Sequence, residues 1–246
     1  MFCMLVALGK IPARILIDNM QTIAEDKTII HEHNEQRGLG SWAHKDGWGI
    51  AYLQKERWII KKSIAPFFED KSSLQEIKKI TTSALILHVR KASGSSVALR
   101  NTHPFFLEKN KREYVFCHNG DVNEKISYHP HFVAQGETDS EQLFYSILTA
   151  GEKYSLWKAI QKTVTQYTKK RGTNIILSTK DKTYVGIAPT AYVKYYTMSF
   201  TQTPQFLIVS SEPLQELKSL HWENVLPGTI LEIDNKSRKI KKYPVE

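Results

Sequence analysis

Apolar residues follow two spacings along this chain, and each spacing predicts a different kind of element. Short runs rich in branched and aromatic residues, bounded by Gly, Asn, Asp or Pro, indicate β-strands. They lie at residues 2–8, 47–53, 57–63, 83–90, 114–120, 173–179, 182–190, 206–212 and 229–235. Apolar residues three and four apart predict amphipathic helices over residues 12–24, 72–80, 140–150 and 153–169.

The order of these elements bears on the fold class. Strands gather towards both ends of the chain and helices lie between them, which favours stacked sheets covered by helices over a regular βαβ alternation. A chain of 246 residues can bury a sizeable core, and it contains no repeat, low-complexity tract or obvious linker. We therefore expect one domain spanning residues 1–246.

Composition excludes several classes of protein. With 41% hydrophobic and 24% charged residues, the chain is neither disordered nor fibrous. No apolar run approaches the length of a membrane span, and the first residues lack the features of a secretory signal. Two cysteines, Cys3 and Cys117, are too few to staple a secreted scaffold. These observations predict a soluble cytoplasmic protein that does not enter a membrane.

The net charge of +9 leaves a nucleic-acid partner open as a separate hypothesis. However, the basic residues occur in small groups scattered along the chain, with no single arm or helix that collects them. That distribution favours a solvated surface, so nucleic-acid binding is disfavoured. His31, His33 and His44 match no tight zinc spacing, and we expect no metal and no cofactor.

Four stretches carry candidate chemistry, and each also has a purely structural interpretation. Cys3 is either a small core hydrophobe or a nucleophile. Asn119-Gly120, in the sequence FCHNGDVN, is either a tight hairpin turn or an oxyanion hole made of an amide and a backbone N–H. Arg90 ends an apolar strand, where it either snorkels to solvent or grips a carboxylate.

The fourth stretch is GETDSEQLF, residues 136–144. Thr138 and Glu141 have the spacing of a capping box, and Asp139 in the first turn suits the helix dipole. An acidic residue at such a position can instead bind a substrate ammonium group.

Taken in chain order, Cys3 and the motifs HKDGWGIA, HVRKAS, NTHPF, CHNGD and GETDSE resemble the class II glutamine amidotransferase family. Two later stretches, SSEPL and VLPGTILEI, also resemble its C-terminal portion, so the resemblance covers nearly the whole chain. Each motif is weak alone, but their common order is specific. The resemblance implies an α+β fold, the four-layer αββα sandwich of two mainly antiparallel sheets found in N-terminal nucleophile hydrolases.

The resemblance also implies roles for individual residues. Cys3 would be the thiol nucleophile, activated by the α-amino group of an N-terminal cysteine. The other implied roles are the glutamine carboxylate site at Arg90, the ammonium site at Asp139, the oxyanion hole at Asn119 and Gly120, and the pocket wall at Thr102 and His103. The expected reaction is hydrolysis of the γ-carboxamide of glutamine, or of a related γ-glutamyl amide, through a cysteine thioester.

The chain departs from the pattern of the family that it resembles at the first residues. The usual members of that family begin Met-Cys, whereas Met1 and Phe2 precede Cys3 here. Activity therefore depends on Cys3 becoming N-terminal, and the alternative is a catalytically impaired subunit that still binds glutamine. The chain resembles the standalone members of the family, for which the expected partners are the γ-glutamyl substrate and a synthase or peptidase protein.

Overall fold

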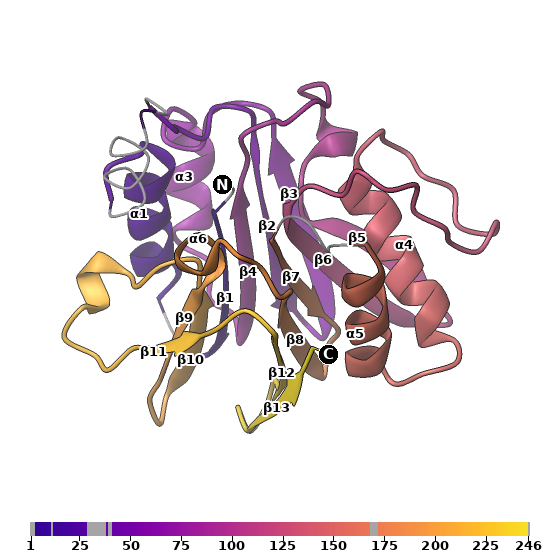
Figure 1. Cartoon of the computed structure of the whole chain (residues 1–246). Coiled ribbons are helices and arrows are strands. Elements are labelled where there is room, and N and C mark those ends of the chain that lie inside the picture. Colours follow the sequence, from indigo (N-terminus) through magenta and orange to yellow (C-terminus); the bar gives the residue numbers. More distant parts are fainter. Residues whose placement is uncertain (1–2, 11, 29–37, 39–40, 168–171, 246) are drawn as a thin grey trace. The chain divides into compact units, whose positions relative to one another are not determined.

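The computed structural model of this chain describes residues 3–10, 12–28, 38, 41–167 and 172–245. These residues divide into two compact units, each built on one β-sheet (Figure 1). The first unit comprises Met1–Pro104 and Ser199–Asn224, and the second comprises Phe105–Met198 and Val225–Glu246. The single domain expected over residues 1–246 stays a prediction.

The first unit contains a sheet that has seven strands among the described residues, with β1 at its centre. In spatial order these strands are β11 (Glu223–Val225), β9 (Met198–Gln202), β10 (Phe206–Ser210), β1 (Cys3–Gly9), β4 (Ala84–Val89), β2 (Trp48–Gln54) and β3 (Arg57–Ser63). The pairings from β9 to β3 are antiparallel. Every residue of β1 is buried, as expected of a strand with a neighbour on each side.

Two helices of the first unit confirm helices that the spacing of apolar residues predicted. In α1 (Ala13–Ala24) most apolar positions are buried, among them Leu16, Ile17, Met20 and Ile23. In α3 (Lys71–Ile77) the carboxylate of Asp70 accepts a hydrogen bond from the backbone N–H of Ser73 at 3.3 Å, which satisfies a donor in the first turn. This helix ends three residues before the predicted Ile80. Short 3-10 helices lie at Leu99–Asn101 and Gln215–Leu217.

The second unit contains a sheet that has six strands within the described part of the chain. In spatial order they are β13 (Ile240–Pro244), β12 (Thr229–Asp234), β8 (Lys182–Ile187), β7 (Thr173–Ser178), β6 (Arg112–Gly120) and β5 (Phe105–Lys109), and all neighbours are antiparallel. Its helices are α4 (Asp139–Gly151), α5 (Leu156–Tyr167) and the short α6 (Val193–Tyr196).

Helices α4 and α5 pack on one face of this sheet through an apolar core. Phe116 of β6 stacks on Phe144 of α4, with ring centroids 5.1 Å apart. Since alternate residues of a strand share a face, His118 and Gly120 lie on the same side of β6 as Phe116, and Asn119 lies on the other. The end of β6 therefore presents different residues to its two sides.

Helix α4 begins at the predicted cap. The hydroxyl of Thr138 accepts a hydrogen bond from the N–H of Glu141 at 3.3 Å, an interaction worth about 1 kcal/mol. The second half of the predicted capping box is wrong. The Glu141 carboxylate accepts instead from the N–H groups of Gln135 (2.9 Å) and Gly136 (2.7 Å), so it holds the loop that enters the helix.

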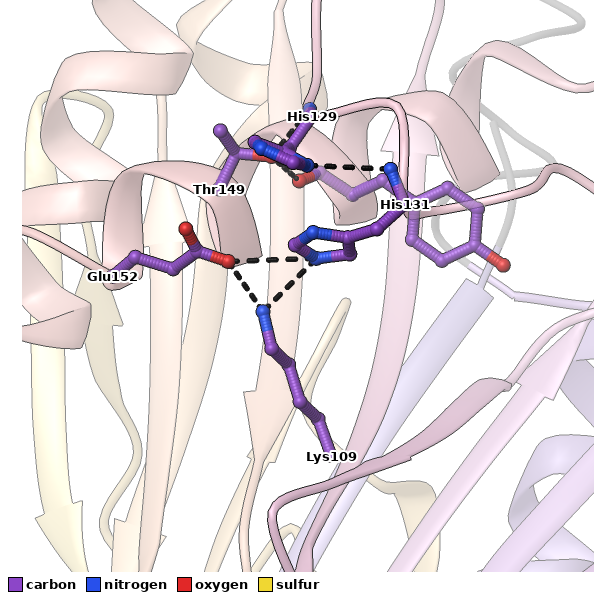
Figure 2. Close-up of polar contacts among 6 residues, drawn as sticks. Lys109, His129, His131, Thr149 and Glu152 are labelled. Carbon is purple, nitrogen blue, oxygen red and sulfur yellow. Dashed lines mark hydrogen bonds and ion pairs between the residues drawn. The ribbon is translucent and has the colours of Figure 1, made fainter.

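The far end of α4 is tied to β5 and to the loop after β6 (Figure 2). The ammonium of Lys109 contacts the Glu152 carboxylate and lies 3.0 Å from Nε2 of His131. The backbone N–H of His129 donates to the hydroxyl of Thr149 at 2.9 Å. These contacts anchor the loop through which the chain passes from Gly120 to α4.

Candidate active site

Cys3 opens β1 and its side chain is fully buried. It pairs with Val89 of β4, so Arg90 follows directly after its partner on the neighbouring strand. Burial raises the pKa of the Cys3 thiol well above its usual value, and the negative charges of Glu212 and Asp26 raise it further. At neutral pH the group is therefore a protonated thiol, and it requires a base before it can attack an amide.

Glu212 is a neighbour of Cys3 to which the sequence patterns gave no role. The N–H of Ser211 donates to the carbonyl of Met4 at 3.0 Å, and the N–H of Met4 donates to the Ser211 hydroxyl at 3.1 Å. Glu212 follows Ser211, and Cys3 precedes Met4, so Glu212 and Cys3 lie next to this bonded pair on the two segments. Glu212 is 6% exposed, so a carboxylate is buried at the level of the thiol.

Arg90 does not snorkel to solvent, because its side chain lies in a buried position with 3% exposure. Its guanidinium donates to the carbonyl of Asp46 at 3.2 Å, to the hydroxyl of Ser95 at 2.8 Å and to the carbonyl of Ser96 at 3.3 Å. The arginine thus joins two loops at the end of β4. Its predicted role as a carboxylate ligand stays a prediction.

Thr102 and His103 lie against the glycine-rich start of β2. A Cβ atom on Gly49 would lie 2.1 Å from the carbonyl oxygen of His103, and one on Gly47 would lie 3.3 Å from Oγ1 of Thr102. The His103 ring packs on His88 of β4, with centroids 4.2 Å apart. The glycines of this motif therefore permit the close approach of residues 102–103, and both proposed pocket residues are buried.

Asn119 and Gly120 belong to the second unit, where they end strand β6. They pair with Asn174 and Thr173 of β7, so the tight hairpin turn suggested by Asn-Gly is wrong here. Tertiary pairing with a strand distant in sequence overrides the local turn preference. Gly120 has φ +152°, and a Cβ atom there would lie 2.7 Å from the carbonyl oxygen of Gly172. The position therefore requires glycine.

Asp139 is the first residue of α4 and connects the helix to the chain that leaves β6. One carboxylate oxygen accepts from the N–H of Val122 at 2.7 Å, and the other accepts from the N–H of Ser140 at 2.7 Å. The negative charge lies at a helix N-terminus, where the dipole stabilises it. Its predicted role as an ammonium ligand stays a prediction.

The described residues offer neither a metal-binding cluster nor a membrane-spanning helix. Among the described residues, no three or more His, Cys, Asp and Glu side chains are grouped so that they can hold a metal ion. His44 is buried, whereas His31 and His33 lie outside the described residues. None of the helices in the described ranges is long and apolar enough to span a membrane.

Residues 19–188 match the protein family described as glutamine amidotransferases class-II. The chain belongs to the class II glutamine amidotransferases. The matched segment contains six of the seven predicted site residues, which are Arg90, Thr102, His103, Asn119, Gly120 and Asp139. Cys3 and Glu212 lie outside it.

Two relatives show how far the similarity of this amidotransferase extends. YafJ of Escherichia coli (strain K12) is 33% identical over 154 residues, which are 58% of this chain and 60% of YafJ. The protein MJ1515 of Methanocaldococcus jannaschii is 35% identical over 133 residues, which are 49% of this chain and 36% of the relative. Each match covers less than two thirds of the relative's own length.

Solved structures confirm the expected fold of this amidotransferase. Glutamine phosphoribosylpyrophosphate amidotransferase from B. subtilis superposes with a TM-score of 0.74 at 16% identity, over 100% of this chain and 49% of that chain. A glutamine aminotransferase class-II domain protein from Silicibacter pomeroyi gives a TM-score of 0.62 at 14% identity, over 99% of both chains. The chain has the α+β fold of N-terminal nucleophile hydrolases, with two mainly antiparallel sheets and helices.

Proposed function

We propose that this chain hydrolyses the γ-carboxamide of glutamine, or of a related γ-glutamyl amide, through a thioester on Cys3. Family membership supports the reaction class. The observation that carries the proposal for this residue is the position of Cys3, which is buried at the first residue of the central strand and pairs with the residue before Arg90.

The proposed reaction has two steps. The α-amino group of an N-terminal Cys3 takes the thiol proton, and the sulfur attacks the side-chain carbonyl carbon of the substrate. The C–N bond then breaks, the amine leaves with the transferred proton, and a γ-glutamyl thioester remains. Water attacks the thioester, which releases a γ-carboxylate and restores the thiol. The carbonyl oxygen is negative in both tetrahedral intermediates, and Asn119 and Gly120 donate hydrogen bonds to it.

In this proposal the protein recognises the two charged groups of the substrate's amino-acid backbone. Arg90 binds the α-carboxylate, since a guanidinium offers two parallel N–H donors to a carboxylate. Asp139 binds the α-ammonium, and Thr102 and His103 shape the pocket. The leaving group is ammonia from glutamine or a larger amine from a γ-glutamyl amide. Ammonia would pass to a synthase partner, whereas a peptidase partner fits a γ-glutamyl peptide substrate.

A second function is favoured by one feature of the sequence. Met1 and Phe2 precede Cys3, so the nitrogen of Cys3 is a peptide N–H and cannot accept a proton. A chain in that form would bind glutamine without hydrolysing it. The buried thiol with its raised pKa agrees with an inactive state of this form. A cytoplasmic location suits either function, because reducing conditions keep the thiol intact.

Release of ammonia and glutamate from glutamine by a form of the chain that begins at Cys3 tests the proposal. Cys3→Ser in the same form is the matched control. Intact mass after brief mixing with substrate should show a γ-glutamyl adduct on the cysteine form alone. Glutamine binding with no turnover and no adduct would favour the second function, and the absence of both would contradict the two together.

A further inference from the structure

His118 directly precedes the proposed oxyanion-hole residues Asn119 and Gly120 on β6, and its ring contacts Ser140 at the N-terminus of α4. It shares a face of that strand with Gly120 and is 1% exposed. The proposed mechanism gives this histidine no role. A buried imidazole next to the reacting residues therefore requires its own explanation.

A chain of hydrogen bonds connects His118 to Asp139. Nδ1 of His118 lies 2.9 Å from the hydroxyl oxygen of Ser140, which in turn donates to a carboxylate oxygen of Asp139 at 3.3 Å. A carboxylate only accepts hydrogen bonds, so the Ser140 hydroxyl donates to Asp139 and accepts from His118. This order fixes the tautomer, with the proton on Nδ1 and a lone pair on Nε2.

The charge state of the ring agrees with this tautomer. Burial lowers the pKa of His118, although the carboxylates of Asp139 and Asp121 oppose that shift. The ring is therefore neutral at neutral pH. Ser140, whose hydroxyl lies at hydrogen-bond distance from the ring, carries no charge that would stabilise an imidazolium.

The other edge of the ring lies beneath Gly120. A Cβ atom on Gly120 would lie 3.0 Å from Nε2 of His118 and 3.0 Å from Oγ1 of Thr173. Neither of these buried atoms has a hydrogen-bond partner among the described residues. The imidazole thus packs against the Gly120 backbone on the face opposite to the Asn119 side chain.

We propose that His118 is a positioning residue that holds the oxyanion hole in register with the ammonium site. Ser140 and Asp139 hold one edge of its ring, and the other edge packs against Gly120 and so sets the position of the Gly120 backbone. This inference rests on the proposed function, because the residues that His118 would position act in that mechanism. The ligand is a γ-glutamyl group, whose α-ammonium must reach Asp139 while its side-chain carbonyl reaches the oxyanion hole. The distance between these two sites must therefore stay fixed.

Kinetics of the Cys3-first form test the inference. His118→Phe and Ser140→Ala each break the chain of hydrogen bonds, and each should lower kcat by about 10- to 100-fold, since small displacements of reacting groups cost rates of this size. KM should change much less. The double variant should be no slower than the slower single variant, because both remove one linkage. His118→Asn keeps a donor near the Nδ1 position and should recover most of kcat.

Ser146→Ala is the matched control, since Ser146 is also a buried serine of α4. It should leave kcat unchanged. Equal kcat in His118→Phe and the parent form would overturn the inference. So would a loss of equal size in Ser146→Ala, because that would show a general effect of helix substitutions.

Two measurements on the full chain need no amidase activity, and they separate this inference from the proposed function. Nitrogen NMR of the ring should show the neutral tautomer protonated on Nδ1, and Ser140→Ala should abolish that preference. Hydrogen exchange at Gly120 should accelerate in Ser140→Ala but not in Ser146→Ala. A proton on Nε2, or unchanged exchange at Gly120, would overturn the inference even in an active enzyme. Both expected signatures in an inactive chain would count against the proposed function alone.

Discussion

Glu212 and Cys3 lie next to a backbone hydrogen bond from Ser211 to Met4, which joins β1 to the segment that follows β10. Both side chains are buried, so a carboxylate and a thiol share a region of low dielectric. A second negative charge is costly there, which is why Glu212 helps the thiol to keep its proton. The same carboxylate would favour the ammonium form of an N-terminal Cys3.

The first prediction concerns this pair. Glu212→Gln removes a negative charge that raises the pKa of the Cys3 thiol, so the substitution should lower that pKa. Because burial is the larger cause, the pKa should stay above that of an ordinary cysteine. Ultraviolet absorbance of the thiolate across a pH titration measures the change, with the Cys3→Ser chain subtracted to remove Cys117 and tyrosine.

Glu223→Gln serves as the control for this charge change, since Glu223 is exposed in β11 of the same unit. It should leave the Cys3 titration where it is. A Cys3 pKa that moves equally in both variants would mean that net charge, and not the neighbouring carboxylate, governs the thiol.

The second prediction concerns recognition of the substrate backbone. Arg90→Ala and Asp139→Asn should each weaken glutamate or glutamine binding by roughly 1.5 to 3 kcal/mol, the range for hydrogen bonds to charged groups. Calorimetry gives the affinities. Arg90 also joins two loops, so Ser95→Ala, which removes one of its loop contacts and keeps the guanidinium, separates the two effects. Unchanged affinity in both charge variants would exclude the proposed binding roles.

The third prediction concerns the oxyanion hole. Asn119→Ala in the Cys3-first form should lower kcat by about 10²- to 10³-fold and leave substrate affinity nearly intact, because the amide acts on charge that develops only during attack. Steady-state kinetics separate the two parameters. A rise confined to KM would instead mark Asn119 as a binding residue.

The fourth prediction concerns the backbone at Gly120. Gly120→Ala should lower the free energy of unfolding by about 1–3 kcal/mol, because φ is +152° and the new methyl would lie 2.7 Å from the Gly172 carbonyl oxygen. Chemical denaturation measures the loss. Gly151→Ala is the control, since its Cβ would meet only a flexible methyl group of Leu156 at 3.3 Å. A smaller loss at Gly120 than at Gly151 would contradict this account.

Sequence patterns predicted most of the interior strands and the edge strand β3, but they missed the other three edge strands and the interior strand β9. All nine predicted strands are present, and four strands were missed. Three of the four, β5, β11 and β13, lie at sheet edges. An edge strand has one neighbour and carries exposed polar residues, as in the IKKYP sequence of β13, so its composition does not differ from that of a loop.

The order of the motifs predicted the candidate site residues. It did not predict the buried residues next to them, Glu212 and His118. Arg90 and Asp139 were singled out because a charge follows an apolar strand or starts a helix. Glu212 could not be found in this way, since its relation to Cys3 depends on the register between strands at opposite ends of the chain. His118 is likewise explained by tertiary contacts, because only the folded unit brings its ring to Ser140.

The last prediction concerns the residues before Cys3. In a chain that retains Met1 and Phe2, the nitrogen of Cys3 is a neutral peptide N–H, and the thiol pKa is raised by burial and by Glu212. The amine that is the proposed base is then missing, and the thiolate population at neutral pH is small. An N-terminal Cys3 would supply an amine with a pKa of about 8 beside its own thiol.

We therefore expect the unprocessed chain to be nearly inactive with glutamine and slow to react with diazo-oxo-norleucine, whereas a form that begins at Cys3, released by protease cleavage of a fusion, gains both activities. Cys3→Ser in that form should lose them again. Intact mass must first verify each N-terminus, and ammonia release and inhibitor labelling then measure the two activities. If the chain verified to begin at Met1 turns over as fast as the released form, the amine of Cys3 is not the base. The thiol proton must in that case go to another group, and the buried carboxylate of Glu212 is the first to test by substitution.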